Sequence, residues 1–179
     1  SEERVTTPKT APDFVIKGDR GETFYVSKRP GLTVFLDYAF RNFDVAIWSA
    51  STESYIQPIL ENILSKGQKP KFVWDRSKVT SRKEPESLNY VFLKRLKKVF
   101  DSMSWQKEKI LIVDDTSETA LDNYGNYIPC PPYYGDPRDT VLVMLERYLE
   151  SIKDKPNFRE IDKRNWMEKL DVEPEGEPI

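Results

Sequence analysis

The sequence predicts an α/β domain in which helices flank a mostly parallel sheet. Three observations lead to this prediction. Short β-rich runs alternate with longer amphipathic segments, as they do in βαβ units. Residues 45–48 and 110–113 are continuously apolar, which is typical of strands that are buried on both faces. The chain has 179 residues, 38% of them hydrophobic and 32% charged, which suits one domain with a single core. The expected architecture is therefore Rossmann-like.

The first third of the chain predicts a lead-in, a hairpin and a helix. Residues 1–12 are polar and contain Pro8 and Pro12, so we expect a loose lead-in. Residues 14–16 and 23–26 are β-rich and flank a Gly-Asp-Arg-Gly turn, which predicts a small β-hairpin inserted near the N-terminus. Residues 32–42 carry apolar side chains at helical spacing and predict a helix with one buried face.

The apolar run 45–48 begins a unit of strand, polar turn and helix. It leads through Ser49-Ala50-Ser51-Thr52 into a helix that we expect over residues 53–64, with Thr52 as its N-cap. Pro58 lies inside this helix. Because proline has no N–H and crowds the preceding turn, we expect a kink or a loosened first turn there.

The second half of the chain continues the alternation of strands and helices. Further strands are expected over residues 71–74, 110–113 and 127–129, and helices over 90–103 and 140–152. The charged residues 75–87 separate two of these elements. The strand at 127–129 is expected at an edge of the sheet, because Pro129 cannot donate to a ladder.

The C-terminal residues are polar and predict an extension to the domain. Residues 162–170 suggest a short helix, and residues 172–179 suggest a flexible tail. The expected organisation is a lead-in over residues 1–12, a domain over 13–155 and a partly flexible extension over 156–179.

Composition excludes several classes of function. A net charge of -2 and a pI near 5.4 provide no basic footprint, so we expect no direct binding to nucleic acid. Cys130 is the only cysteine and there is no histidine, which excludes an intrachain disulfide, cysteine zinc sites, Ser-His-Asp triads and histidine-ligated metals. No apolar run reaches the roughly 18 residues of a membrane span. We expect a nuclear or cytoplasmic monomer whose chemistry uses carboxylates, hydroxyls and lysine.

Polar residues follow two of the predicted strands, at the edge where open parallel sheets bind ligands. Asp114 and Asp115 end the run 110–113, and their oxygens suit Mg²⁺, although acidic helix starts are common. Ser49 and Ser51 predict an anion site at a helix N-terminus or, equally, a plain N-cap. Taken alone, Lys94 is expected to lie at the surface of the predicted helix, because lysine is rarely buried.

The order of these residues is more informative than any one of them. A strand with serine, then a lysine, then a strand with two aspartates resembles motifs two, three and four of the haloacid-dehalogenase (HAD) superfamily. The branch that contains RNA polymerase II C-terminal-domain phosphatases and NLI-interacting-factor-like proteins is the most similar, over residues 13–149. The matching segments are Lys28-Arg29-Pro30-Gly31 with Phe35-Leu36, Ile47-Trp48-Ser49-Ala50-Ser51, Phe92-Leu93-Lys94-Arg95-Leu96, Ile112-Val113-Asp114-Asp115-Thr116-Ser117 and Asp139-Thr140.

The resemblance implies a HAD-like fold and a Mg²⁺-dependent phosphatase of the aspartyl-phosphate type. Its substrate would be phosphoserine or phosphothreonine in a protein or peptide, such as the polymerase tail. Asp115 would ligate Mg²⁺ with support from Asp114, and Lys94 would neutralise charge in the transition state. Ser49, with the backbone amides near Ala50 and Ser51, would hold the phosphate. In this family one aspartate attacks phosphorus, and a second, two positions on, acts as acid and then base.

Both of those aspartates belong to an Asp-x-Asp-x-Thr motif that occurs nowhere in the 179 residues. Two explanations remain open. The strand that carries the motif precedes Ser1, in which case residues 1–179 alone are inactive, or the protein is a catalytically inactive HAD-like binding module of the translocase type. We favour the first, because Ser49, Lys94 and Asp115 would be under no catalytic demand in a relative without a nucleophile.

Overall fold

The computed structural model describes residues 11–83 and 90–170. Most of the predicted lead-in, and the predicted tail over 172–179, lie outside these residues. The chain divides into two compact units. Unit 1 consists of Ser1–Arg76 and Tyr133–Asp139, and unit 2 consists of Ser77–Pro132 and Thr140–Ile179.

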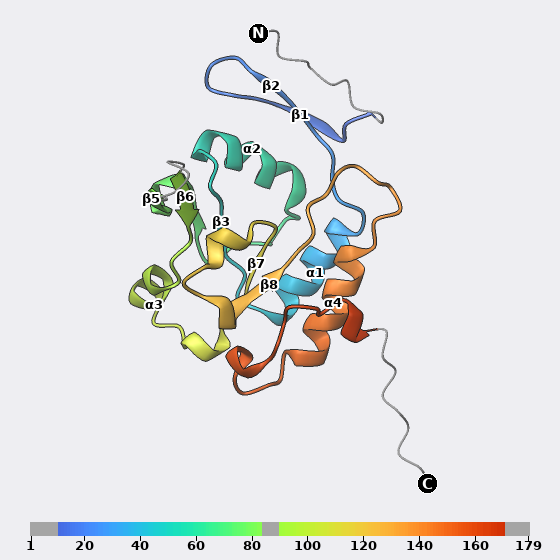
Figure 1. Cartoon of the computed structure of the whole chain (residues 1–179). Helices are drawn as coiled ribbons and strands as arrows, with labels where there is room; N and C mark the ends of the chain where they lie inside the picture. Colours follow the sequence, from blue (N-terminus) through green and yellow to red (C-terminus); the bar gives the residue numbers. More distant parts are fainter. Residues whose placement is uncertain (1–10, 84–89, 171–179) are drawn as a thin grey trace. The chain divides into compact units, whose positions relative to one another are not determined.

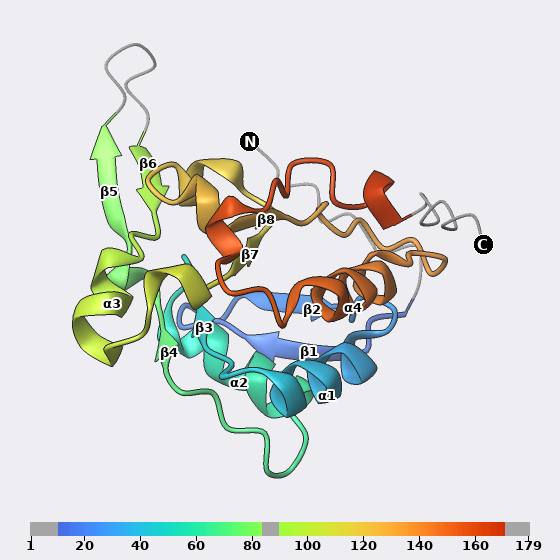
Figure 2. The same ribbon diagram turned by 90° about the horizontal axis from the view of Figure 1, so that it is seen from below.

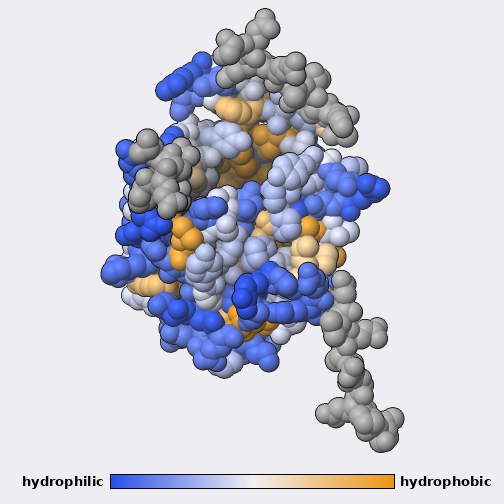
Figure 3. Space-filling model, in the orientation of Figure 1, coloured by the Kyte–Doolittle hydropathy of each residue, from blue (hydrophilic) through white to orange (hydrophobic). Residues whose placement is uncertain are grey.

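Unit 1 begins with an antiparallel hairpin of β1 (Phe14–Lys17) and β2 (Thr23–Val26). Gly21 lies in its turn at φ 84°, a conformation that glycine adopts without steric cost. One face of the hairpin packs on α2 (Glu53–Ile63), where the Phe24 and Tyr55 rings meet edge to face at 5.1 Å. Hydrophobic surface gathers over α2 beneath the hairpin (Figures 1 and 3).

The rest of unit 1 is a helix and a βαβ unit. Helix α1 (Leu32–Asn42) spans the predicted residues. Strand β3 (Ile47–Trp48) pairs in parallel with β4 (Val73–Trp74), and α2 connects them. The strands were expected to be longer, over 45–48 and 71–74. Pro58 lies inside α2, which remains one continuous helix.

The second hairpin, in unit 2, corrects one predicted helix. Residues 90–103 form strand β6 (Tyr90–Leu93) followed by the shorter helix α3 (Lys97–Met103). Strand β6 pairs antiparallel with β5 (Thr80–Lys83) (Figure 2). Strand β5 lies in the charged segment 75–87, in which no strand was predicted. The helix prediction failed because Tyr90, Val91 and Phe92 are β-formers and burial alternates along the strand: Leu93 is fully buried and Phe92 is exposed.

The core of unit 2 combines a parallel strand pair with a helix. Strand β7 (Ile112–Asp114) pairs with β8 (Tyr127–Pro129), and α4 (Val141–Ile152) buries one apolar face. Ile128 of β8 and Leu145 of α4 are fully buried. Single turns of 3-10 helix complete the chain at Arg76–Lys78, Lys107–Lys109, Ser117–Ala120, Tyr124–Asn126, Phe158–Glu160 and Glu168–Leu170.

Strand pairing is more divided than the single sheet that we expected. Within the described residues the strands form four two-stranded sheets, two of them parallel and two of them hairpins. The sequence-based expectation assumed an additional strand carrying Asp-x-Asp-x-Thr, which these residues do not contain. None of the described helices is both long enough and apolar enough to span a bilayer.

The C-terminal segment 156–170 packs against the rest of unit 2 through buried side chains. Trp166 is 1% exposed; its indole N–H donates to the Pro129 carbonyl at 2.7 Å, and its ring lies 5.4 Å from that of Tyr148. The ammonium of buried Lys163 donates to the Phe158 and Ile161 carbonyls, and burial lowers the pKa of Lys163. The predicted helix over 162–170 is reduced to one 3-10 turn, because the Asp162 carboxylate accepts from the Arg164 N–H and favours a local turn.

Candidate active site

Two residues predicted from motif order, Lys94 and Asp114, form a buried ion pair in unit 2. Lys94 comes directly after β6, and Asp114 is the last residue of β7. The Lys94 ammonium donates to Asp114 Oδ2 at 2.5 Å, and the two side chains are 11% and 7% exposed. The second carboxylate oxygen of Asp114 accepts from the Thr116 N–H at 2.9 Å. Both oxygens of Asp114 therefore have partners, and the buried charge of Lys94 is compensated.

Asp115 has a different environment from Asp114. It lies just beyond β7 with its side chain exposed, and one of its oxygens accepts a long hydrogen bond of 3.3 Å from the Thr116 hydroxyl. Across the parts of the chain that the structure describes, no group of three or more aspartate, glutamate, cysteine or histidine residues gathers as a metal site. Magnesium in proteins is commonly held by only one or two carboxylates, with water and substrate oxygens completing the shell. Asp115 therefore fits as one oxygen ligand of Mg²⁺, with Asp114 beside it engaged by Lys94.

An open cavity of about 500 Å³ adjoins Asp115. The loop after β7 and the chain after β8 form two of its walls. The third wall is the C-terminal segment, with Arg164, Asn165 and Met167. The sequence analysis missed this wall, since neither periodicity nor a motif connects residues 164–167 with Asp115.

Two buried residues that the sequence analysis also missed hold the ion pair in place. The Asn123 amide donates to the Lys94 carbonyl at 3.0 Å. The Tyr127 hydroxyl donates to the Asp114 carbonyl at 3.0 Å. Burial, together with the nearby Asp114 carboxylate, raises the pKa of Tyr127 to about 12, so this hydroxyl keeps its proton at neutral pH. No sequence signal marks either residue, because their partners are backbone atoms of distant segments.

The predicted phosphate-binding residues Ser49, Ala50 and Ser51 lie together in unit 1, between β3 and α2. The Ser49 N–H completes the β3–β4 pairing on the Trp74 carbonyl at 2.8 Å, and the Ser49 hydroxyl accepts from the Ser51 N–H at 3.1 Å. Ala50 is exposed at the start of this loop. A hydroxyl and the N–H groups of a helix start are suitable ligands for an anion.

The neighbouring N-cap was predicted at the right residue but with different bonding. Thr52 is the N-cap of α2, yet its hydroxyl shares a hydrogen bond of 3.0 Å with the Ser54 hydroxyl and does not cap the backbone. The Thr52 carbonyl accepts from the Tyr55 and Ile56 N–H groups, which begins the helix.

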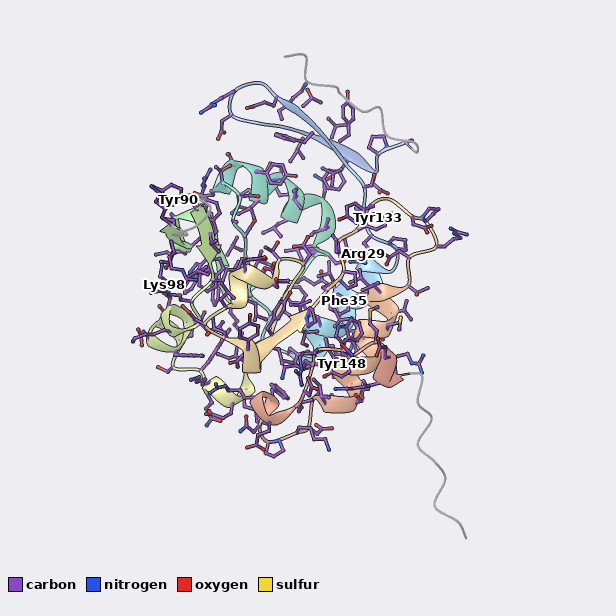
Figure 4. All side chains as sticks on the ribbon, in the orientation of Figure 1. Arg29, Phe35, Tyr90, Lys98, Tyr133 and Tyr148 are labelled. Atoms are coloured by element: carbon purple, nitrogen blue, oxygen red, sulfur yellow. The ribbon has the colours of Figure 1, made fainter. Side chains whose placement is uncertain are left out.

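The Lys-Arg-Pro-Gly segment anchors a distant loop in unit 1. Arg29 donates two hydrogen bonds of 2.8 Å to the two carboxylate oxygens of Asp139, and the side chains are 12% and 13% exposed. The Arg29 guanidinium also lies 5.7 Å from the centre of the Tyr133 ring (Figure 4). The segment 133–139 is thereby tied to the residues that precede α1.

Comparisons with known proteins agree with this arrangement of motifs. A family model described as NLI interacting factor-like phosphatase matches residues 2–159. An uncharacterized FCP1 homology domain-containing protein of Schizosaccharomyces pombe is 28% identical over 72% of this chain and 59% of its own length. The CTD nuclear envelope phosphatase 1B of Danio rerio is 26% identical over 88% of this chain and 62% of its own length. The chain thus spans about three fifths of the length of these two relatives.

Two further similarities were found. A putative CTD phosphatase-like protein of Invertebrate iridescent virus 3 is 30% identical over 75% of this chain and 77% of its own length. The structure of the fission yeast RNA polymerase II CTD phosphatase Fcp1 bound to beryllium fluoride is similar with a TM-score of 0.49 and 17% identity, over 88% of this chain and 49% of that one. Since the family model covers most of the residues and the viral relative matches over three quarters of its length, the chain belongs to the NLI interacting factor-like phosphatase family.

Proposed function

We propose that this chain is the greater part of a Mg²⁺-dependent phosphoprotein phosphatase of the aspartyl-phosphate type, acting on phosphoserine or phosphothreonine. The observation that carries the proposal is the buried Lys94–Asp114 pair beside the exposed carboxylate of Asp115. An ammonium held at the carboxyl end of a parallel strand, next to an exposed carboxylate, is a combination suited to phosphoryl transfer.

Each residue has a distinct role in this proposal. The Lys94 ammonium, held on Asp114, donates to the phosphoryl oxygens as negative charge develops on them. Ser49, with the amides near Ala50 and Ser51, binds and orients the phosphoryl group. Asp115 would hold Mg²⁺, which supplies charge neutralisation and Lewis acidity when bound. Asp114 fixes the position of Lys94 and supports Asp115 at the metal.

The nucleophile and the acid–base residue must come from a strand outside residues 1–179, because no Asp-x-Asp-x-Thr occurs within them. The exposure of β7 supports this part of the proposal. Ile112 and Val113 belong to the continuously apolar run 110–113, yet Val113 is 40% exposed and β8 is the only strand paired with β7 among the described residues. An apolar strand with one unpaired edge is a place where another strand adds.

The substrate is proposed to be a phosphorylated protein segment, such as the tail of RNA polymerase II. The names of relatives support this choice, because they include a putative CTD phosphatase-like protein and a CTD nuclear envelope phosphatase. We propose a nuclear-associated location, which the name of the CTD nuclear envelope phosphatase supports. Direct contact with nucleic acid is not part of the proposal, and we propose a monomer.

Hydrolysis of an aryl phosphate by a form of the protein extended upstream of Ser1, with Mg²⁺ or with a chelator, tests the chemistry. Asp115→Asn and Lys94→Ala should each lower kcat by about a thousandfold or more, as expected for loss of transition-state electrostatics. Lys97→Ala is the matched control, since Lys97 is an exposed lysine three residues away whose ammonium pairs with the exposed Asp101. It should leave kcat unchanged.

Three outcomes would contradict the proposal. A normal kcat in Lys94→Ala would show that the ion pair does not have the assigned role. Hydrolysis that persists in the presence of a chelator would show that the reaction does not depend on a metal ion. An extended protein that has no pair of upstream aspartates and only binds peptides would establish the translocase-type alternative. Because Lys94→Ala leaves Asp114 buried without its partner, Lys94→Arg serves as a second variant that keeps the charge but changes its geometry.

A further inference from the structure

We propose that Asn123 is a positioning residue for Lys94, fixing the main chain at the lysine so that its ammonium is held at the end of β7. This inference rests on the proposed function, in which Lys94 acts on the phosphoryl group. Asn123 contacts Lys94 through the backbone and takes no part in the reaction itself.

The position of Lys94 explains why it needs such a partner. It lies one residue beyond β6 and three residues before α3 begins at Lys97, so its carbonyl belongs neither to the β5–β6 pairing nor to a helix. A buried carbonyl requires a donor. The Asn123 amide supplies it at 3.0 Å, and both residues are buried.

The other end of Lys94 is held as well. Its ammonium donates to Asp114 Oδ2, and Asp114 is itself fixed at its second oxygen by the Thr116 N–H. The Asp114 carbonyl accepts from the Tyr127 hydroxyl at 3.0 Å and from the Cys130 N–H at 2.9 Å. A lysine side chain has four rotatable bonds and keeps its head in one place only when its backbone and its ammonium are both restrained. Asn123 provides the backbone restraint.

A second asparagine offers a closely matched comparison. Asn126 lies three residues further along and is also buried, and its amide donates to the Lys107 carbonyl at 2.7 Å and the Ile110 carbonyl at 2.8 Å. It therefore makes the same kind of bond as Asn123, but to the chain that precedes β7. Loss of the Asn126 amide should weaken the fold without moving Lys94.

The consequence for catalysis is specific to the chemical step. A shift of about 1 Å in a catalytic group costs about a hundredfold in rate. In the proposed roles substrate binding depends on Ser49 and its neighbours, whereas Asn123 acts on Lys94. Loss of the Asn123 amide should therefore lower kcat and leave KM almost unchanged.

The experiment compares Asn123→Asp, which keeps the shape but removes the N–H donor, with Asn123→Gln, which keeps the donor, and with Asn126→Leu. Two readouts are needed: kcat and KM of the upstream-extended protein, and the ¹⁵N–¹H NMR signal of the Lys94 ammonium in residues 1–179. We expect Asn123→Asp to lower kcat about 10- to 100-fold, with KM changed less than about twofold, and to broaden or shift the Lys94 signal. Asn123→Gln should recover part of both, and Asn126→Leu should change neither readout in the folded fraction.

The inference is overturned if Asn123→Asp keeps the wild-type kcat. It is also overturned if the Asn123 and Asn126 variants lose kcat only in proportion to their unfolded fraction while the Lys94 signal stays in place. A wild-type extended protein without hydrolytic activity, but with a Lys94 signal that responds to Asn123→Asp, separates the two ideas: the proposed function then fails, and the positioning of Lys94 stands.

Discussion

Arg29 and Asp139 illustrate how much a single residue depends on a partner far away in the sequence. They lie 110 positions apart, and their two parallel hydrogen bonds join the start of α1 to the segment 133–139 within unit 1. The family resemblance singled out both residues, but nothing in their local sequence pairs them. Only the folded chain shows that the planar guanidinium and the carboxylate meet in the two-pronged geometry that arginine favours.

Breaking this pair should reduce stability more than breaking an exposed one. We expect Asp139→Asn to lower the free energy of unfolding by about 2–4 kcal/mol, because it leaves a largely buried guanidinium without its counter-charge. Urea denaturation at pH 7 measures the change. Arg138→Ala is the control: Arg138 pairs with Asp136 at the surface, and its loss should change stability by less than about 0.5 kcal/mol. Equal effects of the two variants would show that the Arg29–Asp139 pair is as weak as a surface pair.

Tyr148 leads to a prediction about alkaline pH. Its ring is buried on α4, its hydroxyl has no hydrogen-bond partner within the described residues, and burial followed by the Asp162 charge raises its pKa from 10.0 to about 12 (Figure 4). Between pH 10 and 12 the unfolded chain has released this proton and the folded chain has not, so stability should fall as pH rises through that window. Tyr148→Phe should flatten the decline. Urea midpoints at pH 9, 10 and 11 measure it, and identical slopes in both proteins would exclude this cause.

At the scale of elements, the sequence pattern predicted the bounds of several helices and strands closely but misassigned others. Helix α1 and strand β8 have the predicted bounds, and α4 begins one residue later than expected. The run 90–103 was misread because its apolar residues satisfy helical spacing, whereas burial of alternate residues and pairing with β5 favour a strand at its start. Pairing with a distant segment is a tertiary effect that a single window of sequence does not contain.

The candidate site was predictable to the extent that it follows strand ends. Asp114 and Asp115 were singled out because a clear apolar run precedes them. Lys94 was singled out through motif order and not through its surroundings, since the expected helix would have left it on the surface, whereas the structure buries it after β6. Asn123, Tyr127 and the C-terminal wall of the cavity act through packing and backbone contacts, for which the sequence carries no pattern.

The C-terminal segment 156–170 should depend on a single large side chain. Trp166→Ala removes a fully buried ring and its bond to the Pro129 carbonyl, so we expect a loss of about 3–5 kcal/mol in stability. Limited proteolysis should then cut within residues 156–170 at lower urea than in the wild type. Trp166→Phe keeps most of the packing and should be milder. Arg164→Ala, at an exposed neighbour, is the control, and a segment equally resistant to protease in Trp166→Ala would show that other contacts hold it.

At the scale of the whole molecule, composition constrained the chemistry and the family model identified the family to which the chain belongs. A chain without histidine and with one cysteine has few choices for catalysis besides carboxylates, hydroxyls and lysine. The missing Asp-x-Asp-x-Thr gives the clearest prediction at this scale. Residues 1–179 alone should show no Mg²⁺-dependent hydrolysis of an aryl phosphate, although circular dichroism should report a folded α/β chain. Turnover by this segment at the rate of the extended protein would require a different nucleophile.

Pro129 has a consequence for how the protein behaves at high concentration. Its ring removes the N–H that a neighbouring strand would use, and its carbonyl is already bonded to the Trp166 indole. At Pro129, β8 therefore has neither a backbone N–H donor nor a vacant carbonyl acceptor to offer a second chain. The β8 edge of the β7–β8 pair is consequently a poor template for intermolecular β-sheet growth. Removing the indole from Trp166 should therefore increase aggregation in concentrated solution by more than the loss of stability alone explains.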